Sequence, residues 1–98
     1  MDQELFEWDD RKAKANLLKH KVGFPEAATI FEDPYVVVEP DLDHSFTEPR
    51  EKAIGFSVKE RVLLVVYVEL HARIRLISAR RATSEERGRY ESQFDSVR

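Results

Sequence analysis

The sequence predicts a single α+β domain: a mainly antiparallel sheet of about four to five strands, with two helices before it and one after it. Helical patterns occupy the two ends of the chain, and short apolar or β-branched runs fill the middle. Tight turns at Lys59–Glu60 and His71–Ala72 join successive runs, as in a meander. Because 98 residues supply one modest core, residues 1–98 are expected to form one domain.

A short strand and a helix are expected first. Leu5 to Trp8 alternates in the manner of a strand, and a helix should follow from about Arg11 to Lys21. Asp9 or Asp10 can cap the start of this helix, because a carboxylate accepts hydrogen bonds from the free N–H groups there. The helix face expected to pack on the sheet carries Ala13, Leu17 and His20.

A second, shorter helix is expected from Pro25 to Phe31. Proline suits the first turn of a helix, where its missing N–H costs nothing. Asp33-Pro34 should end the helix, because the residue before a proline avoids the helical region.

The remaining strands are expected at Tyr35–Glu39, Lys52–Val58, Val62–Leu70 and Arg73–Ala79. The third of these is apolar on both faces until Glu69, which predicts a central strand. Thr83, followed three residues later by Glu86, forms a capping-box pattern and predicts a last helix over Ser84–Phe94.

Composition limits the possible functions. The chain has no cysteine, which excludes a disulfide framework, a thiolate zinc site and a cysteine nucleophile. Its longest apolar run, Val62–Val68, is too short to span a bilayer, and its acidic start does not resemble a secretory signal, so a cytoplasmic protein is expected. The net charge of −3 argues against indiscriminate coating of nucleic acid. Charge is unevenly distributed, however, because residues 24–51 are acidic and residues 73–98 are basic.

The segment Arg73–Tyr90 gathers arginines on a predicted strand and beside a predicted helix start. Planar guanidinium groups bind phosphate oxygens in pairs, and a helix N-terminus favours anions. Arg75, Arg80 and Arg81 are therefore the best candidates for a phosphate site, with Arg73 behind them. The alternative is that these are solvent-facing strand positions that form weak surface ion pairs.

Four segments resemble the BrnT toxins of bacterial type II toxin–antitoxin systems, in the same order as in that family. They are FEWDDRKAKANLLKHKVGFPEAATIFEDP (Phe6–Pro34), IGFS (Ile54–Ser57), LLVVYVE (Leu63–Glu69) and RIRLISARRATSEERGRYE (Arg73–Glu91). Two residues depart from the family pattern: Lys21 stands where glycine is usual and Gly23 where serine is usual. Arg81 replaces a frequent lysine and keeps the charge.

The resemblance implies a RelE-like fold and a ribonuclease toxin that arrests translation. It also implies a BrnA-type antitoxin partner, a ribbon-helix-helix protein that would be the DNA reader, so that DNA contact is only indirect. Two toxins joined by an antitoxin dimer would form a heterotetramer. No cofactor and no membrane partner are implied.

RNA can be cut without a metal if its own 2′-hydroxyl attacks the adjacent phosphate. The protein must then accept that proton, stabilise the added negative charge and protonate the leaving 5′-oxygen. His20, the family-matching histidine, could transfer a proton near neutral pH, or it could simply favour the helix C-terminus as a cation. Glu69 could act as a base or pair with the arginines.

Further candidates for RNA contact have structural alternatives. Lys19 lies beside His20, and Ser78 could allow a strand to approach or could be a plain serine at the edge of the core. Tyr90 could donate a proton or stack on a base, although its spacing from Phe94 also suits a packing anchor. Trp8 could stack a nucleobase or belong to the core.

Two further questions stay open on sequence alone. Asp41, Asp43 and His44 have metal-like composition, but turn preference explains them and no metal is expected. The protein is expected to be a metal-independent endoribonuclease. The alternative is a non-catalytic interaction module of the same fold, which binds an antitoxin and takes part in operon autorepression.

Overall fold

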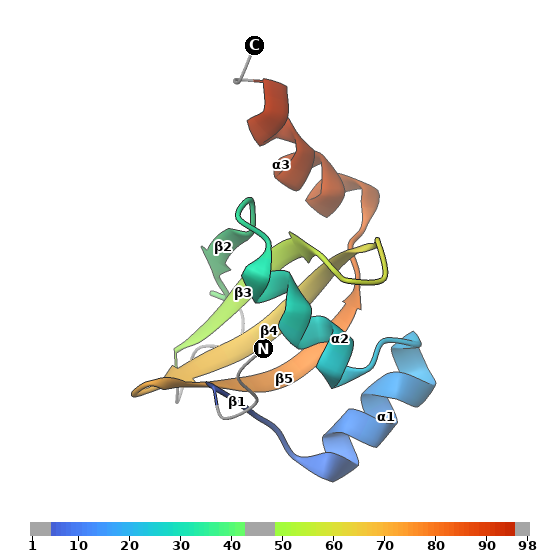
Figure 1. Ribbon diagram of the computed structural model, residues 1–98, viewed down its shortest axis with the longest axis vertical. Helices are drawn as coiled ribbons and strands as arrows, with labels where there is room; N and C mark the ends of the chain where they lie inside the picture. Colours follow the sequence, from blue (N-terminus) through green and yellow to red (C-terminus); the bar gives the residue numbers. More distant parts are fainter. Residues whose placement is uncertain (1–4, 43–48, 96–98) are drawn as a thin grey trace.

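The computed structural model of the chain describes residues 5–42 and 49–95, in which five strands form one mixed sheet (Figure 1). The strands lie in the order β1 (Phe6–Glu7), β5 (Arg73–Arg81), β4 (Val62–Leu70), β3 (Arg50–Phe56) and β2 (Val37–Pro40). Strand β1 is parallel to β5, and every other pair of neighbours is antiparallel. The predicted element order and the central position of β4 are confirmed.

The helices are α1 (Asp10–His20), α2 (Phe24–Thr29) with a 3₁₀ turn η2 (Ile30–Glu32), and α3 (Ser84–Asp95). Helices α1 and α2 and the turn η2 lie on one face of the sheet, and α3 projects beyond one end of it (Figure 1). We call the face under α1, α2 and η2 the covered face and the opposite one the open face. No helix in the described residues is long and apolar enough to cross a membrane.

The main core fills the covered face. Its buried residues come from β1, from the segment Val22–Ile30 and from one side of each of β3, β4 and β5: Phe6, Val22, Phe24, Ala27, Ala28, Ile30, Ala53, Leu63, Val65, Tyr67, Leu76 and Ala79. Gly55 lets η2 approach β3 closely, because a Cβ there would lie 3.0 Å from the Ile30 Cβ and 3.2 Å from its carbonyl oxygen. Removing this apolar surface from water is the main stabilising contribution to the fold.

Helix α1 is attached differently from what its sequence predicts. Asp9 caps it as expected, accepting from the Arg11 and Lys12 N–H groups at 2.8 and 3.1 Å. Leu17, however, is 51% exposed, and the residue that α1 buries is Asn16. The expected packing face was therefore wrong at Leu17, because buried hydrogen bonds of a polar side chain hold the helix in place.

The turn after α1 keeps a left-handed residue despite the absence of glycine. Lys21 has φ 60° and ψ 30°, and its N–H donates to the Leu17 carbonyl at 2.9 Å. Gly23 follows as the N-cap of α2 without a side-chain hydrogen bond. The Arg61 guanidinium donates to the Lys21 carbonyl at 3.0 Å, which ties this turn to the β3–β4 connection.

Helix α3 begins with the predicted capping box. The Thr83 N–H donates to Glu86 at 2.9 Å, and the Glu86 N–H donates to the Thr83 hydroxyl at 3.2 Å. The helix covers a second, smaller cluster on the open face, made of Ile54, Val62, Leu64 and Tyr90. The Tyr90 hydroxyl donates to Asp33 at 2.6 Å, so that α3 is also bound to the end of η2.

Candidate nucleic-acid interface

Strand pairing shows which basic side chains share the open face. Residues directly opposite each other on neighbouring strands point to the same side of a sheet. Three adjacent rows run from β3 through β4 to β5: Arg50–Val68–Arg75, Lys52–Val66–Ser78 and Ile54–Leu64–Arg80. Since Ile54 and Leu64 belong to the cluster under α3, all three rows lie on the open face. We call Arg50, Lys52, Arg75, Ser78 and Arg80 the open basic face.

The dimensions of this surface suit a phosphodiester. Strands β3 and β5 flank β4, so that their backbones lie roughly 10 Å apart. Lys52 lies in the row between those of Arg75 and Arg80. Long cationic side chains on either side of a gap of this width can converge on one phosphate group.

Lys52 is a candidate that the sequence did not reveal. Its residue type is common on surfaces. Only the pairing of β3 with β4, and of β4 with β5, places it across β4 from Ser78. In the described part of the chain, Lys52 has no ion-pair or hydrogen-bond partner for its ammonium group. The side-chain alternation along β3 was the one available signal, since it groups Lys52 with Arg50 and Ile54.

Three of the four arginines of β5, in contrast, already have carboxylate partners. Glu7 of β1 accepts from Arg73 Nε at 2.8 Å and from Arg75 Nη1 at 3.0 Å. The hydrogen bond from Arg73, with that from Arg75, holds the pKa of the Glu7 carboxyl below its usual range. One carboxylate on the parallel edge strand thus neutralises part of the charge of two arginines.

Arg80 is bound more tightly than Arg73 or Arg75. Its two terminal nitrogens donate to the two oxygens of Glu86 at 2.7 and 2.9 Å, a bidentate pair beside the start of α3. The hydrogen bond from Arg80 and those from Thr83 lower the pKa of Glu86 to about 2. The same contact raises the pKa of Arg80, so both groups stay charged across the physiological range.

Arg81 and Glu69 lie on the other side of the sheet. Arg81 pairs with Leu63, and Glu69 pairs with Ile74, and both partners pack in the core of the covered face. Arg81 therefore does not share a surface with Arg75 and Arg80. The carboxylates that pair with the arginines are Glu7 and Glu86 rather than Glu69.

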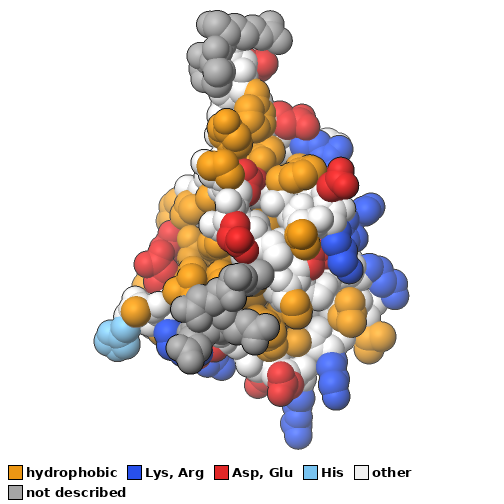
Figure 2. Space-filling model, in the orientation of Figure 1, with side chains coloured by type: hydrophobic (Ala, Val, Ile, Leu, Met, Phe, Trp, Pro, Cys, Tyr) orange, Lys and Arg blue, Asp and Glu red, His pale blue; other side chains and the backbone are white. Residues whose placement is uncertain are grey.

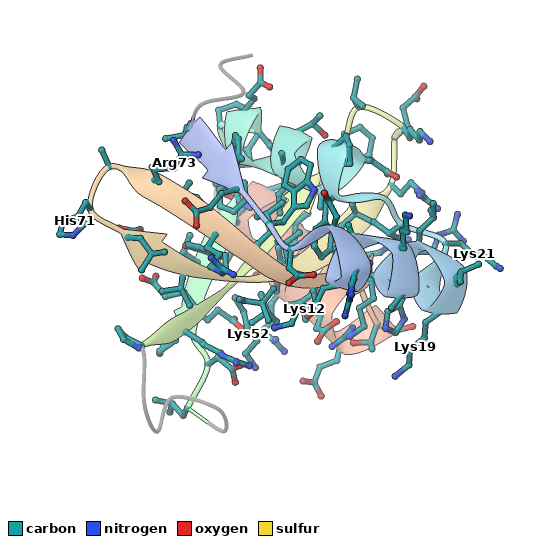
Figure 3. All side chains as sticks on the ribbon, turned by 90° about the horizontal axis from the view of Figure 1, so that it is seen from below. Lys12, Lys19, Lys21, Lys52, His71 and Arg73 are labelled. Carbon is teal, nitrogen blue, oxygen red and sulfur yellow. The ribbon has the colours of Figure 1, made fainter. Side chains whose placement is uncertain are left out.

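The basic residues at the end of α1 differ in exposure. His20, the last residue of the helix, is half-buried, and Lys19 is exposed. Figure 3 shows Lys12, Lys19 and Lys52 pointing toward the same side of the molecule. Among the described residues, no hydrogen bond or ion pair joins His20 to an arginine.

Two aromatic candidates are held in packing contacts. The Trp8 ring meets Phe24 edge-to-face with centroids 5.8 Å apart, against the main core. Tyr90 is 6% exposed, and its hydroxyl is bound to Asp33. Burial raises the pKa of the Tyr90 phenol, and the bond to Asp33 raises it further. The structure therefore uses Tyr90 to hold α3, while Ser78 is half-buried in the open basic face.

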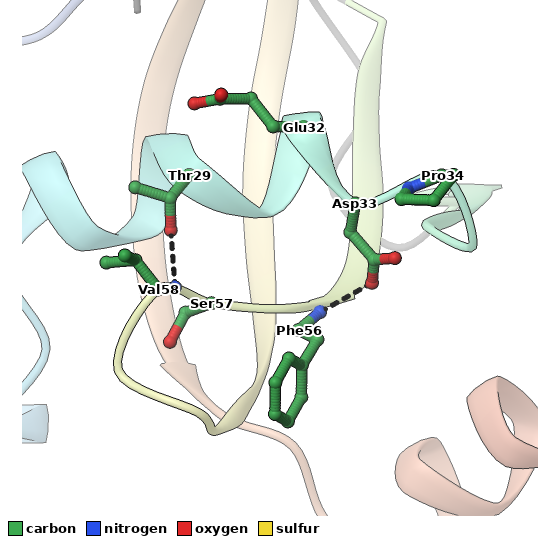
Figure 4. A pocket seen from close by; sticks show the side chains of 7 residues that line it. All are labelled: Thr29, Glu32, Asp33, Pro34, Phe56, Ser57 and Val58. Atoms are coloured by element: carbon green, nitrogen blue, oxygen red, sulfur yellow. Dashed lines mark hydrogen bonds between the residues drawn. The ribbon is translucent and has the colours of Figure 1, made fainter.

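A hollow lies between η2 and the end of β3, lined by Thr29, Glu32, Asp33, Pro34, Phe56, Ser57 and Val58 (Figure 4). Its polar groups bind one another: the Val58 N–H donates to Thr29 at 3.0 Å, and the Phe56 N–H donates to Asp33 at 2.8 Å. The hollow has no cation for a phosphate, so it is a less suitable site than the open basic face.

The prediction that the protein holds no metal comes from its composition. Part of the segment with metal-like composition lies outside the described residues. Asp43 and His44 are not described, while Asp41 is buried at 4% exposure. Within residues 5–42 and 49–95, no group of three or more histidine or acidic side chains is arranged to hold a metal ion.

Comparison with known proteins identifies the family. A model of the ribonuclease toxin BrnT of type II toxin–antitoxin systems matches residues 8–86. The chain belongs to the BrnT family. It is therefore a ribonuclease toxin with an antitoxin partner, as the resemblance of its sequence implied.

A solved BrnT structure supports the fold. The 1.1 Å crystal structure of the Brucella abortus ribonuclease toxin BrnT is 22% identical, with a TM-score of 0.63, over 81% of this chain and 96% of that chain. No curated protein matches the chain. At this identity the crystal structure supports the α+β architecture, and the position of the site depends on the geometry described above.

Proposed function

We propose that this BrnT-family chain is a metal-independent endoribonuclease that binds RNA across its open basic face, arrests translation and is neutralised by a BrnA-type antitoxin. The observation that carries the proposal is the placement of Arg50, Lys52, Arg75 and Arg80 on one face of the sheet, from the two strands that flank β4. Helix α3 packs on the Ile54–Leu64–Arg80 end of this surface, and the Arg50–Val68–Arg75 row forms its other end.

The geometry supports a division of roles around a scissile phosphate. Arg75 and Arg80 would hold its non-bridging oxygens through their planar guanidinium groups, which offsets the charge added when the 2′-hydroxyl attacks. Lys52, which lies between them on the opposite strand, would add charge and donate a proton to the leaving 5′-oxygen. His20 remains the proposed acceptor of the 2′-hydroxyl proton.

Glu7 and Glu86 compete with RNA for the arginines of β5. A phosphate that binds Arg75 or Arg80 must displace Glu7 or Glu86, whereas it can bind Lys52 without displacing a described partner. Lys52 is therefore proposed as the first cation to contact the backbone. Arg75 and Arg80 would then exchange their carboxylate partners for phosphate oxygens as RNA binding is completed.

The test is inducible expression of Lys52→Ala, with Arg87→Ala as the matched control. Arg87 is an exposed cation on α3 without a described partner, so both variants remove one free positive charge. We expect growth arrest and RNA breakdown to fall at least tenfold in Lys52→Ala and to persist in Arg87→Ala. Both variants should fold normally, because surface substitutions without partners cost about 0.5 kcal/mol or less.

Two outcomes would contradict the proposal. Full RNA cleavage by Lys52→Ala and by the double variant Arg75→Ala/Arg80→Ala, at equal protein levels, would place the site elsewhere. Intact RNA with the unmodified chain, together with normal antitoxin binding, would favour the non-catalytic interaction module. Cleavage in excess chelator tests the metal-independent chemistry, and a strict requirement for Mg²⁺ would overturn it.

A further inference from the structure

Helix α1 does not pack through an apolar stripe. The residue that it buries is Asn16, whose amide donates to the carbonyls of Val22 at 2.9 Å and Ala79 at 2.8 Å and accepts from the Ala79 N–H at 3.0 Å. Surface helices normally turn their leucines toward the core. Here Leu17 is 51% exposed and Leu18 is 74% exposed. The helix thus presents its largest apolar side chains to solvent.

The same helix carries free positive charge. From residue 11 to residue 21 there are five cations and no acid: Arg11, Lys12, Lys14, Lys19 and Lys21. None of the five side chains forms an ion pair with a described residue. Figure 2 shows Lys and Arg side chains over α1 with hydrophobic side chains among them. Exposed leucines among cations that have no described ion-pair partner form a different surface from the open basic face.

Helical spacing sets these residues in one line. Arg11, Lys14 and Leu18 are separated by three and four residues, so they follow a single stripe along the helix, and Leu17 lies beside it. Lys21 follows the stripe as the left-handed C-cap residue at the end of the helix. The stripe is opposite Asn16 and therefore faces away from the sheet. We call Arg11, Lys14, Leu17, Leu18 and Lys21 the outer stripe of α1.

We infer that the outer stripe of α1 is the docking surface for the antitoxin, and that it takes an acidic amphipathic segment of that protein. Apolar side chains of the segment would cover Leu17 and Leu18, and its carboxylates would pair with Arg11, Lys14 and Lys21. Antitoxin partnership follows from family membership, so this inference rests on that relationship and adds the surface and the chemistry of contact.

The leucines favour a protein partner over RNA. Binding to a phosphate backbone is driven by cations and counterion release, to which an exposed leucine contributes nothing. Protein interfaces instead combine a desolvated apolar centre with a charged rim. Lys12 and Lys19 lie on the flank of α1 between the outer stripe and Asn16, and they point to the same side of the molecule as Lys52. A segment that binds the outer stripe and extends over this flank would lie next to the proposed RNA surface. The antitoxin could then block RNA without replacing each arginine contact.

Two double variants test the two parts of the surface. Leu17→Ser/Leu18→Ser removes the apolar centre, and the control is Leu42→Ser, an exposed leucine outside α1 (80% exposed). Lys14→Glu/Lys21→Glu reverses the charge of the stripe, and the control is Lys59→Glu/Arg87→Glu. The probe is the protein encoded in the reading frame adjacent to the toxin's own. Its affinity is measured by titration calorimetry at several salt concentrations, with circular dichroism to verify folding.

We expect both α1 variants to bind this protein at least tenfold more weakly than the controls do. Only the charge variant should also lose salt dependence. Growth arrest without antitoxin should stay unchanged, while rescue by antitoxin is lost.

Binding within twofold of the control in both variants would overturn the inference. So would loss of RNA cleavage in Lys14→Glu/Lys21→Glu with normal antitoxin binding, since the stripe would then be an RNA surface. A chain that never arrests growth would contradict the proposed function alone, because the binding measurement still decides the docking surface.

Discussion

Strand β5 and helix α1 are the two most basic elements of the described chain, and they use their charge differently. In β5, Arg73 and Arg75 share Glu7, and Arg80 is held by both oxygens of Glu86. In α1 and its C-cap, five cations have no described ion-pair partner. A cluster of positive charge in a sequence therefore does not reveal how much of that charge is available to a ligand. Availability depends on whether the fold brings a carboxylate alongside.

The largest expected effect comes from breaking the attachment of α1. Asn16→Ala should lower the free energy of unfolding by about 3 kcal/mol, because it leaves the buried N–H of Ala79 and two carbonyls without partners. Urea denaturation followed by circular dichroism measures this change. Lys14→Ala on the exposed side of the same helix is the control and should change stability by less than about 0.5 kcal/mol. Equal stability of the two variants would show that other contacts hold α1.

The next largest effect concerns the Arg80–Glu86 pair and the dependence of stability on pH. The Arg80 and Thr83 hydrogen bonds lower the pKa of Glu86 from its usual 4.5 to about 2. A carboxyl with a lowered pKa in the folded state stabilises the protein above pH 4.5, and this stabilisation is lost as the pH falls toward 2. Glu86→Gln should therefore be less stable than the wild type at pH 7, by about 1–2 kcal/mol, and the two should converge near pH 2. Thermal melts across this pH range test the prediction, and parallel curves for the two proteins would contradict it.

Glu7→Gln tests whether carboxylates withhold the arginines of β5 from RNA. Removing this charge should raise RNA affinity about fivefold and steepen its dependence on salt, because Arg73 and Arg75 become available to phosphates. Stability should change little, since exposed ion pairs contribute little to the free energy of unfolding. Filter binding at several salt concentrations measures the affinity, with Glu85→Gln as the control on α3. Unchanged affinity would mean that RNA does not contact this part of β5.

The smallest effect is expected at the end of α1. Lys21 has φ 60°, a conformation that a side chain disfavours and glycine accepts. Lys21→Gly should therefore raise the free energy of unfolding by about 0.5 kcal/mol, after allowing for the greater freedom of glycine in the unfolded chain. Chemical denaturation with Lys14→Gly as the opposite control measures it, because glycine inside the helix should destabilise it. A loss of stability in Lys21→Gly would show that its side chain makes a favourable contribution.

Much of the fold followed from local patterns in the sequence. Asp9 before α1, Pro25 in α2 and the Thr83–Glu86 capping box act within one helical turn, so the helix starts were predictable. The apolar run of β4 predicted its central place. Leu17 was predicted wrongly because Asn16 binds Ala79, 63 residues away, and no local pattern reveals such a contact.

The site was less predictable than the fold for the same reason. Alternation along β5 correctly grouped Arg73 with Arg75. The register shifts between Val66 and Tyr67 of β4, however, where β5 has one extra residue between Leu76 and Ser78. Ser78 and Arg80 therefore join the face of Arg75 while Arg81 turns away. Lys52 and Glu7 enter the site only through pairing between distant strands, which the sequence does not display.

The hydrogen bonds of Asn16 also have a consequence at the border of the sheet. Strand β1 covers β5 over only Phe6 and Glu7, and beyond it the backbone of β5 would offer its N–H and C=O groups to another strand. The carboxamide of Asn16 occupies both of these groups at Ala79, in the way that a neighbouring peptide unit would. A single side chain thereby keeps this border closed to strand addition, and its removal should make the protein prone to self-assembly through β5.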